Sequence, residues 1–152
     1  MNYCDSHSRC IKTALSNAEK ICAKNKLKFT GIRRRVLELV WESHKPAKAY
    51  DILQQLGEGD GSPVPPTVYR ALDFLLDNGL VHKINSLNAY VGCSHPGPNN
   101  QCYFLICTNC EQVSECCTSK LGKAIDVSVK ENAFIPESVS LEIQGVCQTC
   151  SA

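Results

Sequence analysis

Apolar positions in the first half of the chain repeat with the period of an α-helix. Thr30 is placed to cap a helix that runs to about Ser43, and the stretch AKAYDILQQL predicts a short helix that ends at Gly57. The turn-rich stretch GEGDGSPVPP separates these helices from the next predicted helix. The apolar face of the first helix has residues at i, i+4, i+7 and i+8: Ile32, Val36, Leu39 and Val40.

The stretch PPTVYRALDFLLDNGL predicts a third helix, because prolines suit the start of a helix and Gly79 suits its end. Arg70 projects away from the apolar face, and Tyr69 and Thr67 lie on its flanks. LVHKINSLNAYVGC then has strand-forming residues around a polar NSLN turn, as a two-stranded wing would. Helices followed by such a hairpin predict a winged helix-turn-helix. The apolar face comprises Val68, Ala71, Leu72, Leu75 and Leu76.

The second half of the chain predicts strands around one helix. CYFLIC is typical of a buried strand, CTNC of a turn and EQVSEC of a returning strand. TSKLGKAIDVSVKENAF has apolar residues at i, i+4 and i+8, as in a helix, and ESVSLEIQGVC alternates from Val139 to Ile143, as in a strand. The predicted fold class is therefore α+β, with a winged helix in residues 1–92 and a small α/β domain in residues 93–152.

Composition places the chain among ordinary globular proteins. It has 152 residues, of which 43% are hydrophobic and 20% charged, and no stretch approaches the roughly 18 apolar residues of a membrane span. The first residues contain no continuous apolar run, so we expect no signal peptide and a cytoplasmic location. Disulfides are rare in that reducing compartment, and the 11 cysteines therefore indicate bound metal.

Charge differs between the two predicted domains. Residues 1–92 carry 13 Lys and Arg against 9 Asp and Glu, whereas residues 93–152 carry 3 against 6. The segment 24–35 holds six basic residues and no acidic one. A basic first half and an acidic second half indicate two different roles, although lysines of this kind also occur on solvated helix faces.

A winged helix would place the helix that carries Arg70 in the major groove of DNA, where a guanidinium pairs with guanine O6 and N7. Tyr69 would reach a phosphate or a thymine methyl group. The alternative is that Arg70 pairs with Asp73 or Asp77 on an exposed helix. Further candidates for contacts with the nucleic acid, mainly with its phosphates, are Thr67, Tyr50, Lys24, Lys26, Lys28, Arg33 and Arg34.

Two C-x-x-C pairs are the strongest chemical signal in the sequence. Cys107 and Cys110 form one pair, and Cys147 and Cys150 form the other. Two such turns brought together present four thiolates in a tetrahedron, the arrangement that holds structural Zn²⁺. Four sulfur ligands leave no open position for a substrate. The alternatives are a redox-active pair, which would not need a second copy, and buried cysteines without a ligand.

Other residues of metal-binding types lie near the junction of the two halves. Cys93 and His95 are two positions apart, so in an extended segment they face the same side. Each residue taken alone is more often simply packed in the fold. The candidates for a second metal site are His82, Cys93, His95, Cys102 and Glu115.

The stretch PPTVYRALDFLLDNGLVHKINSLNAYVGCSH, followed by FLICTNCEQVSE and a terminal C-x-x-C, resembles the ferric uptake regulator family. It is most similar to the zinc-sensing branch of that family, and the resemblance runs from about Ala18 to Cys150. Members are dimeric repressors with an N-terminal winged helix and a C-terminal α/β dimerisation domain. The resemblance thus implies a zinc-responsive homodimer that binds palindromic double-stranded operator DNA of zinc uptake genes. It implies no enzymatic activity, no membrane partner and no small-molecule substrate other than a metal ion.

The resemblance also assigns roles to the candidate ligands. It implies that the cysteines of the two C-x-x-C pairs hold a structural zinc ion. It implies that His82, Cys93 and Glu115 belong to a second, regulatory zinc site at the hinge between the domains.

The fourth ligand of that regulatory site is open. In close relatives it is a histidine seven residues before the first C-x-x-C cysteine, and this chain has Asn100 there, a poor zinc ligand. His95 lies close by, and Cys102 has the same strand parity as position 100, so either residue is a candidate to replace the histidine.

Alternative functions remain for the same sequence. A sibling sensor of iron, nickel or peroxide would use oxygen- and nitrogen-rich ligands, and the thiol of Cys93 argues against it. A zinc-dependent nucleobase deaminase needs a glutamate two residues after a histidine ligand, which neither His82 nor His95 has. A thiol redox sensor would use the remaining cysteines: Cys4, Cys10, Cys22, Cys116 and Cys117.

Overall fold

The computed structural model describes residues 7–43, 45–57, 64–97 and 101–152. The chain divides into two compact units, an N-terminal unit, Met1–Pro96, and a C-terminal unit, Gly97–Ala152. Cys4, Asn100 and residues 58–63 of the predicted turn-rich connection lie outside the described residues. Within the described part of the chain, no helix is both long and apolar enough to cross a bilayer.

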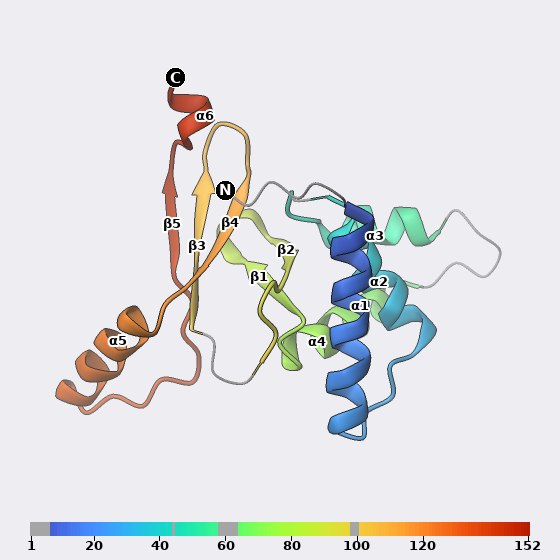
Figure 1. Ribbon diagram of the computed structural model, residues 1–152, viewed down its shortest axis with the longest axis horizontal. Helices are drawn as coiled ribbons and strands as arrows, with labels where there is room; N and C mark the ends of the chain where they lie inside the picture. Colours follow the sequence, from blue (N-terminus) through green and yellow to red (C-terminus); the bar gives the residue numbers. More distant parts are fainter. Residues whose placement is uncertain (1–6, 44, 58–63, 98–100) are drawn as a thin grey trace. The chain divides into compact units, whose positions relative to one another are not determined.

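The described residues of the N-terminal unit form helices followed by a two-stranded antiparallel hairpin (Figure 1). A short 3₁₀ turn, Asn85–Leu87, joins the two strands where the sequence predicts the polar turn. The elements are α1 (His7–Lys24), α2 (Gly31–Trp41), α3 (Ala49–Leu56), α4 (Pro65–Asp77), β1 (Val81–Ile84) and β2 (Ala89–Gly92).

Helix α4 begins and ends where its sequence predicts. Two prolines occupy its first positions, and Gly79 follows it with φ +64°. The amide of Leu80 donates to the carbonyl of Leu75 at 2.9 Å, and the amide of Gly79 donates to that of Leu76 at 3.0 Å. This pair of hydrogen bonds is a Schellman motif, which needs a left-handed residue and therefore favours glycine.

The core of the N-terminal unit is built from one face of each helix and the inner side of the hairpin. An isolated bridge between Ala47 and Tyr90 ties the hairpin to the segment before α3. Burial of this continuous apolar surface holds α4 against α2 and so fixes which face of α4 stays exposed. Side chains with 1% or less of their surface exposed are Ala18, Val36, Leu37, Val40, Ile52, Val68, Leu72, Leu75, Val81, Ile84 and Ala89.

Helix α1 is not among the predicted elements, which begin at Thr30. Its buried residues are Ala14, Ala18 and Cys22, spaced four apart on one face. Because these side chains are small, they form a weaker hydrophobic pattern than the Leu- and Val-rich faces of α2 and α4.

The C-terminal unit contains a three-stranded sheet with the order β4-β3-β5. Strand β3 pairs antiparallel with β4 and parallel with β5. Helix α5 lies between β4 and β5 in the chain and supplies the crossover that a parallel pair needs. The elements are β3 (Cys102–Cys107), β4 (Val113–Cys117), α5 (Ser119–Glu131), β5 (Glu142–Gly145) and α6 (Gln148–Ser151) (Figure 1).

Strand β5 is shorter than the alternating pattern predicts. The pattern starts before Val139, yet the strand covers only Glu142–Gly145. The apolar side chains of this segment are poorly covered within the described C-terminal unit: Val139 and Ile143 are 52% and 46% exposed. The unit exposes a set of large apolar side chains: Leu105, Val127, Phe134, Ile135, Val139, Ile143 and Val146.

Candidate metal centres and DNA-binding surface

The two C-x-x-C pairs converge at one end of the sheet in the C-terminal unit. Cys107 is the last residue of β3, and Cys147 directly precedes α6. Because β3 and β5 are parallel, both end at this edge, where Cys107 is in register with Gly145. The amide of Thr108 donates to the carbonyl of Gly145 at 2.8 Å and holds the two ends together.

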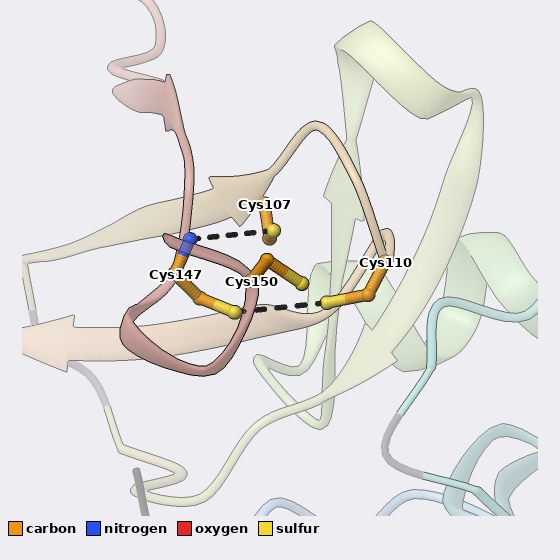
Figure 2. Close-up of side chains that lie close together, drawn as sticks. All are labelled: Cys107, Cys110, Cys147 and Cys150. Atoms are coloured by element: carbon orange, nitrogen blue, oxygen red, sulfur yellow. Dashed lines mark hydrogen bonds between the residues drawn. The ribbon is translucent and has the colours of Figure 1, made fainter. Parts of the chain in front are cut away.

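The distances within this four-cysteine cluster fit a single tetrahedral ion. All four sulfur atoms lie within 4.8 Å of one another, and Figure 2 shows the side chains grouped together. The sulfurs of Cys110 and Cys147 are 3.9 Å apart. Zinc–sulfur bonds of about 2.3 Å at tetrahedral angles place sulfurs about 3.8 Å apart. The donor set and its spacing therefore match structural Zn²⁺.

The electrostatics of the cluster also favour a cation. Hydrogen bonds from the amides of Cys147 and Cys110 lower the pKa of the Cys107 thiol to about 6. The amide of Cys147 lies 3.4 Å from the Cys107 sulfur (Figure 2). The neighbouring sulfurs of Cys147 and Cys110 raise the pKa of Cys150 to about 12. The Cys107 thiolate is thus stabilised, whereas ionisation of Cys150 is disfavoured. A divalent cation would favour ionisation of both, because it binds thiolates.

His82 and Cys93, two candidates for the regulatory site, lie together within the N-terminal unit. His82 is half-buried on β1 and is in register with Val91. Cys93 is buried just after β2, and its amide donates to the carbonyl of Leu80 at 3.0 Å. The two residues are diagonal neighbours on one face of the hairpin, and a ring nitrogen of His82 lies within 4.8 Å of the Cys93 sulfur. Both are therefore placed to bind one metal ion.

Glu115 and Cys102 lie on paired strands of the C-terminal unit. Glu115 is half-buried on β4, opposite Phe104. Cys102 is in register with Cys117, and their sulfurs form a disulfide. While this disulfide is formed, Cys102 has no thiolate to offer a metal ion, and its role as a ligand stays a prediction.

The other candidate for the fourth ligand is His95. His95 is exposed in the segment after β2. Position 100, where close relatives have a histidine and this chain has Asn100, lies outside the described residues. The fourth ligand therefore stays a prediction.

The DNA-binding prediction for α4 depends on which face of the helix is exposed. Val68 and Leu72 are buried, whereas Tyr69 is 51% exposed and Arg70 is exposed beside it. In the described part of the chain, Arg70 forms no ion pair with an acidic residue of its helix. The guanidinium is therefore available to an external partner, and the alternative of an ion pair with Asp73 or Asp77 is not realised. Thr67, the third candidate on this helix, is half-buried.

Arg33 and Arg34 have partners inside the N-terminal unit. The Arg33 guanidinium stacks 3.6 Å from the centre of the Phe74 ring, and Arg34 forms an ion pair with Glu19. These contacts connect α2 to α4 and to α1. The predicted contacts of both arginines with phosphate remain predictions.

Two further DNA-binding candidates lie on the surface of the same unit. Tyr50 on α3 is 64% exposed, and its hydroxyl accepts a hydrogen bond from the side-chain amide of Gln54 at 3.0 Å. Lys28 is exposed just before α2.

Comparison with known sequences identifies the group of proteins to which this fold and these sites belong. Residues 24–144 match the sequence profile of the ferric uptake regulator family. The chain belongs to the ferric uptake regulator family. The predicted α+β fold, with an N-terminal winged helix followed by a small α/β domain, agrees with structures solved for the family.

Individual members of the family show where this chain lies within it. The zinc uptake regulation protein of Escherichia coli (strain K12) is 37% identical over 137 residues, which cover 90% of this chain and 80% of that protein. A zinc uptake regulator solved in complex with zinc and DNA has a TM-score of 0.86 and 36% identity, covering 93% of this chain and 95% of that one. The crystal structure of holo XcZur has a TM-score of 0.84 and 38% identity, covering 91% and 97%.

The sequence alone did not predict that Cys117 lies beside the candidate ligand Glu115. The sequence places Cys117 among the surplus cysteines, yet its sulfur lies 3.8 Å from a carboxylate oxygen of Glu115. The two residues are separated by one position on β4, so they share a face of the strand. The spacing E-x-C within a predicted strand is the signal that could have found this contact.

Proposed function

We propose that this chain is a zinc-responsive transcriptional repressor of zinc uptake genes, with Zn²⁺ as co-repressor for operator binding. The observation that carries the proposal is the 37% identity to a zinc uptake regulation protein over 90% of the chain. The ligand types agree with it, because thiolate, imidazole and carboxylate together suit zinc better than iron. The cytoplasm, where the DNA is, is the proposed location.

The four-cysteine cluster would hold a permanent zinc ion. Four thiolates complete a tetrahedral shell, and no position remains for a substrate or a water molecule. The ion would fix the chain end at Cys147 and Cys150 to the end of β3. Such a site contributes directly to folding, with apparent binding free energies on the order of 10 kcal/mol or more.

The regulatory ion would be bound reversibly by ligands from both units. His82 and Cys93 would supply a ring nitrogen and a thiolate from the N-terminal unit, and Glu115 would supply a carboxylate from the C-terminal unit. A ligand set divided in this way binds the ion best when the two units are held in one arrangement. Zinc would thus favour the arrangement that spaces two α4 helices to fit two half-sites, which is the differential binding that co-repression requires.

Arg70 would read sequence in the operator. Its guanidinium would pair with a guanine in the major groove, while the exposed Tyr69 would contact a phosphate or a thymine methyl group. Lys28 and Tyr50 would add contacts that are independent of sequence.

The C-terminal unit would form the homodimer. Phe134 and Ile135 are 63% and 90% exposed, and burial of such side chains against a second copy would stabilise a dimer. A two-fold dimer presents two identical α4 helices, so its operator should be palindromic.

Titration of operator binding against buffered free metal tests this function. Wild type should bind operator DNA with zinc and not with iron or nickel at buffered physiological levels. Cys93→Ser should remain a folded dimer with its structural zinc, yet require roughly tenfold more zinc or fail to respond, because it loses a thiolate ligand. The matched control is Cys22→Ala, which changes a buried cysteine of the same unit outside the ligand set.

Two results would contradict the proposal. Switching by iron rather than zinc would assign the chain to a sibling sensor of the family. A single zinc ion per chain at saturation would remove the regulatory site altogether.

A further inference from the structure

The pairing of β3 with β4 brings two cysteines together without any help from a metal. Cys102 and Cys117 occupy directly opposite positions of the antiparallel ladder, and their Cα atoms are 4.1 Å apart. The two sulfurs are bonded to each other in the structure. Because the strands are already held by the ladder, the two side chains remain neighbours whether or not this bond exists.

This cysteine pair adjoins a proposed ligand of the regulatory zinc. Cys117 and Glu115 lie on the same face of β4, and the Cys117 sulfur is 3.8 Å from an oxygen of Glu115. The intervening residue, Cys116, faces the other side of the sheet, where it is in register with Tyr103. One strand therefore carries a cysteine beside Glu115 and a second cysteine that faces away from it.

The pair is also accessible to small thiols and disulfides. Cys117 is exposed and Cys102 is half-buried, whereas Cys22 is 2% exposed within the N-terminal core. Accessible disulfides exchange with small thiols more readily than buried ones. The four-cysteine cluster involves other residues, so a bound structural zinc would not prevent this pair from reacting.

We propose that Cys102 and Cys117 form a reversible redox pair, in which reduced Cys117 supplies the fourth ligand of the regulatory zinc site and oxidation removes it. This rests on the proposed function, since it concerns the same regulatory site. Glu115 is the proposed ligand from the C-terminal unit, and Asn100 is a poor candidate for the fourth ligand. The thiolate of reduced Cys117, 3.8 Å from Glu115 on the same strand, would be a second ligand from the C-terminal unit. In the disulfide, neither sulfur carries the charge that zinc binding requires.

The oxidation is a thiol–disulfide exchange with a low-molecular-weight disulfide such as oxidised glutathione. The thiolate of Cys117, the more exposed of the two, attacks one sulfur of the small disulfide, breaks its S–S bond and releases one thiol. The thiolate of Cys102 then attacks the Cys117 sulfur and releases the second thiol. Two protein thiols are oxidised, one small disulfide is reduced to two small thiols, and the two protons pass to those products.

Mapping of the disulfide tests the redox pair. Zinc-loaded full-length protein is equilibrated in glutathione buffers of graded ratio, alkylated, and analysed by peptide mass spectrometry. The expected result is a Cys102–Cys117 link that rises with oxidised glutathione and returns to two thiols on reduction. The link should be absent in Cys102→Ser and Cys117→Ser and present in the control Cys116→Ser. Oxidation that leaves these two residues as thiols, or that links Cys117 elsewhere, overturns the proposal.

Zinc affinity, measured by chelator competition, tests the ligand role. In reduced wild type and in Cys116→Ser, the weaker zinc site should lose at least tenfold in affinity on oxidation, since even loss of an outer partner weakens metal sites on that scale. In reducing buffer, Cys102→Ser should bind zinc like reduced wild type. Because it lacks the thiol that closes the disulfide, it can form only a mixed disulfide and should need more oxidised glutathione than wild type before its affinity falls. Cys117→Ser should be weak in both buffers. Equal affinity of reduced wild type and Cys117→Ser overturns the ligand role.

Operator binding in the same samples separates this proposal from the function on which it rests. If reduced wild type binds operator DNA without regard to zinc, the proposed repressor function fails. The zinc affinities and the disulfide map still decide the role of Cys117 in that case, because neither depends on DNA.

Discussion

The two units of the chain reach stability by different routes. The N-terminal unit buries side chains from every one of its described helices and from its hairpin, and Leu72 and Leu75 are fully buried. In the described part of the C-terminal unit, the buried apolar side chains are only Phe104, Ile106 and Cys107. The same unit leaves Ile135 90% exposed.

This difference shows what each unit needs from outside itself. A segment as short as residues 97–152 buries too little surface for a stable core of its own, and such small units are usually completed by metal or by association. The C-terminal unit has the features for both: a cluster of four sulfurs that could bind a metal ion, and an exposed apolar surface that could associate with a second copy. The N-terminal unit has a sufficient core, so its exposed residues are available for binding.

The largest expected effect is that of Cys107→Ser on the C-terminal unit. Loss of one sulfur should release the structural zinc, whose binding contributes on the order of 10 kcal/mol to such folds. We expect loss of the zinc, loss of the dimer and retention of the N-terminal helices. Zinc analysis, sedimentation and far-UV circular dichroism measure these changes, with Cys116→Ser as the control. A zinc-loaded dimer of unchanged melting temperature would show that the metal is not what completes this unit.

Leu72→Ala should destabilise the N-terminal unit alone. The side chain is 0% exposed on α4, and its truncation should cost about 2–5 kcal/mol because it leaves a cavity in the core. Urea unfolding followed by fluorescence of Trp41 measures this, and zinc content should stay at the wild-type value. Leu27→Ala, at a position 38% exposed, should change stability by less than about 0.5 kcal/mol. Loss of the structural zinc from Leu72→Ala would mean that the two units are not independent.

Arg70→Ala should affect recognition and leave both units folded. We expect a loss of about 1–3 kcal/mol in discrimination between operator and scrambled DNA, because the guanine contact is lost while other contacts survive. Lys28→Ala should instead weaken binding to both DNAs and lower the salt slope by about one. Fluorescence anisotropy over a range of salt concentrations distinguishes the two. Uniform weakening by Arg70→Ala would place Arg70 at a phosphate.

The smallest expected effect concerns two residues with left-handed backbone. Glu111 follows the first C-x-x-C pair with φ +57°, a conformation that is costly for a residue with a Cβ. Glu111→Gly should therefore stabilise the C-terminal unit by up to about 1 kcal/mol. Gly79→Ala, at φ +64°, should destabilise the N-terminal unit by about 1 kcal/mol. Thermal unfolding of both variants measures these changes, and effects of the same sign would contradict the expectation.

Much of the local structure follows from the sequence because its causes lie within a few residues. The apolar face of α4, its prolines and Gly79 determine that helix and its end. The same holds for the hairpin around Asn85–Leu87. Helix α1 escapes prediction because its buried side chains are small, and β5 is predicted too long because alternation alone does not show where a partner strand stops.

The sequence by itself determined the residue types of the candidate metal ligands, the C-x-x-C spacing and the exposed position of Arg70, since side-chain periodicity and short turns are local properties. Only the tertiary structure decided which distant residues meet. The parallel pairing of β3 with β5 brings Cys107 close to Cys147, and the antiparallel register of β3 with β4 joins Cys102 to Cys117. Strand register depends on contacts between segments far apart in the chain, and a shift of one residue would turn each of these sulfurs to the opposite face of the sheet.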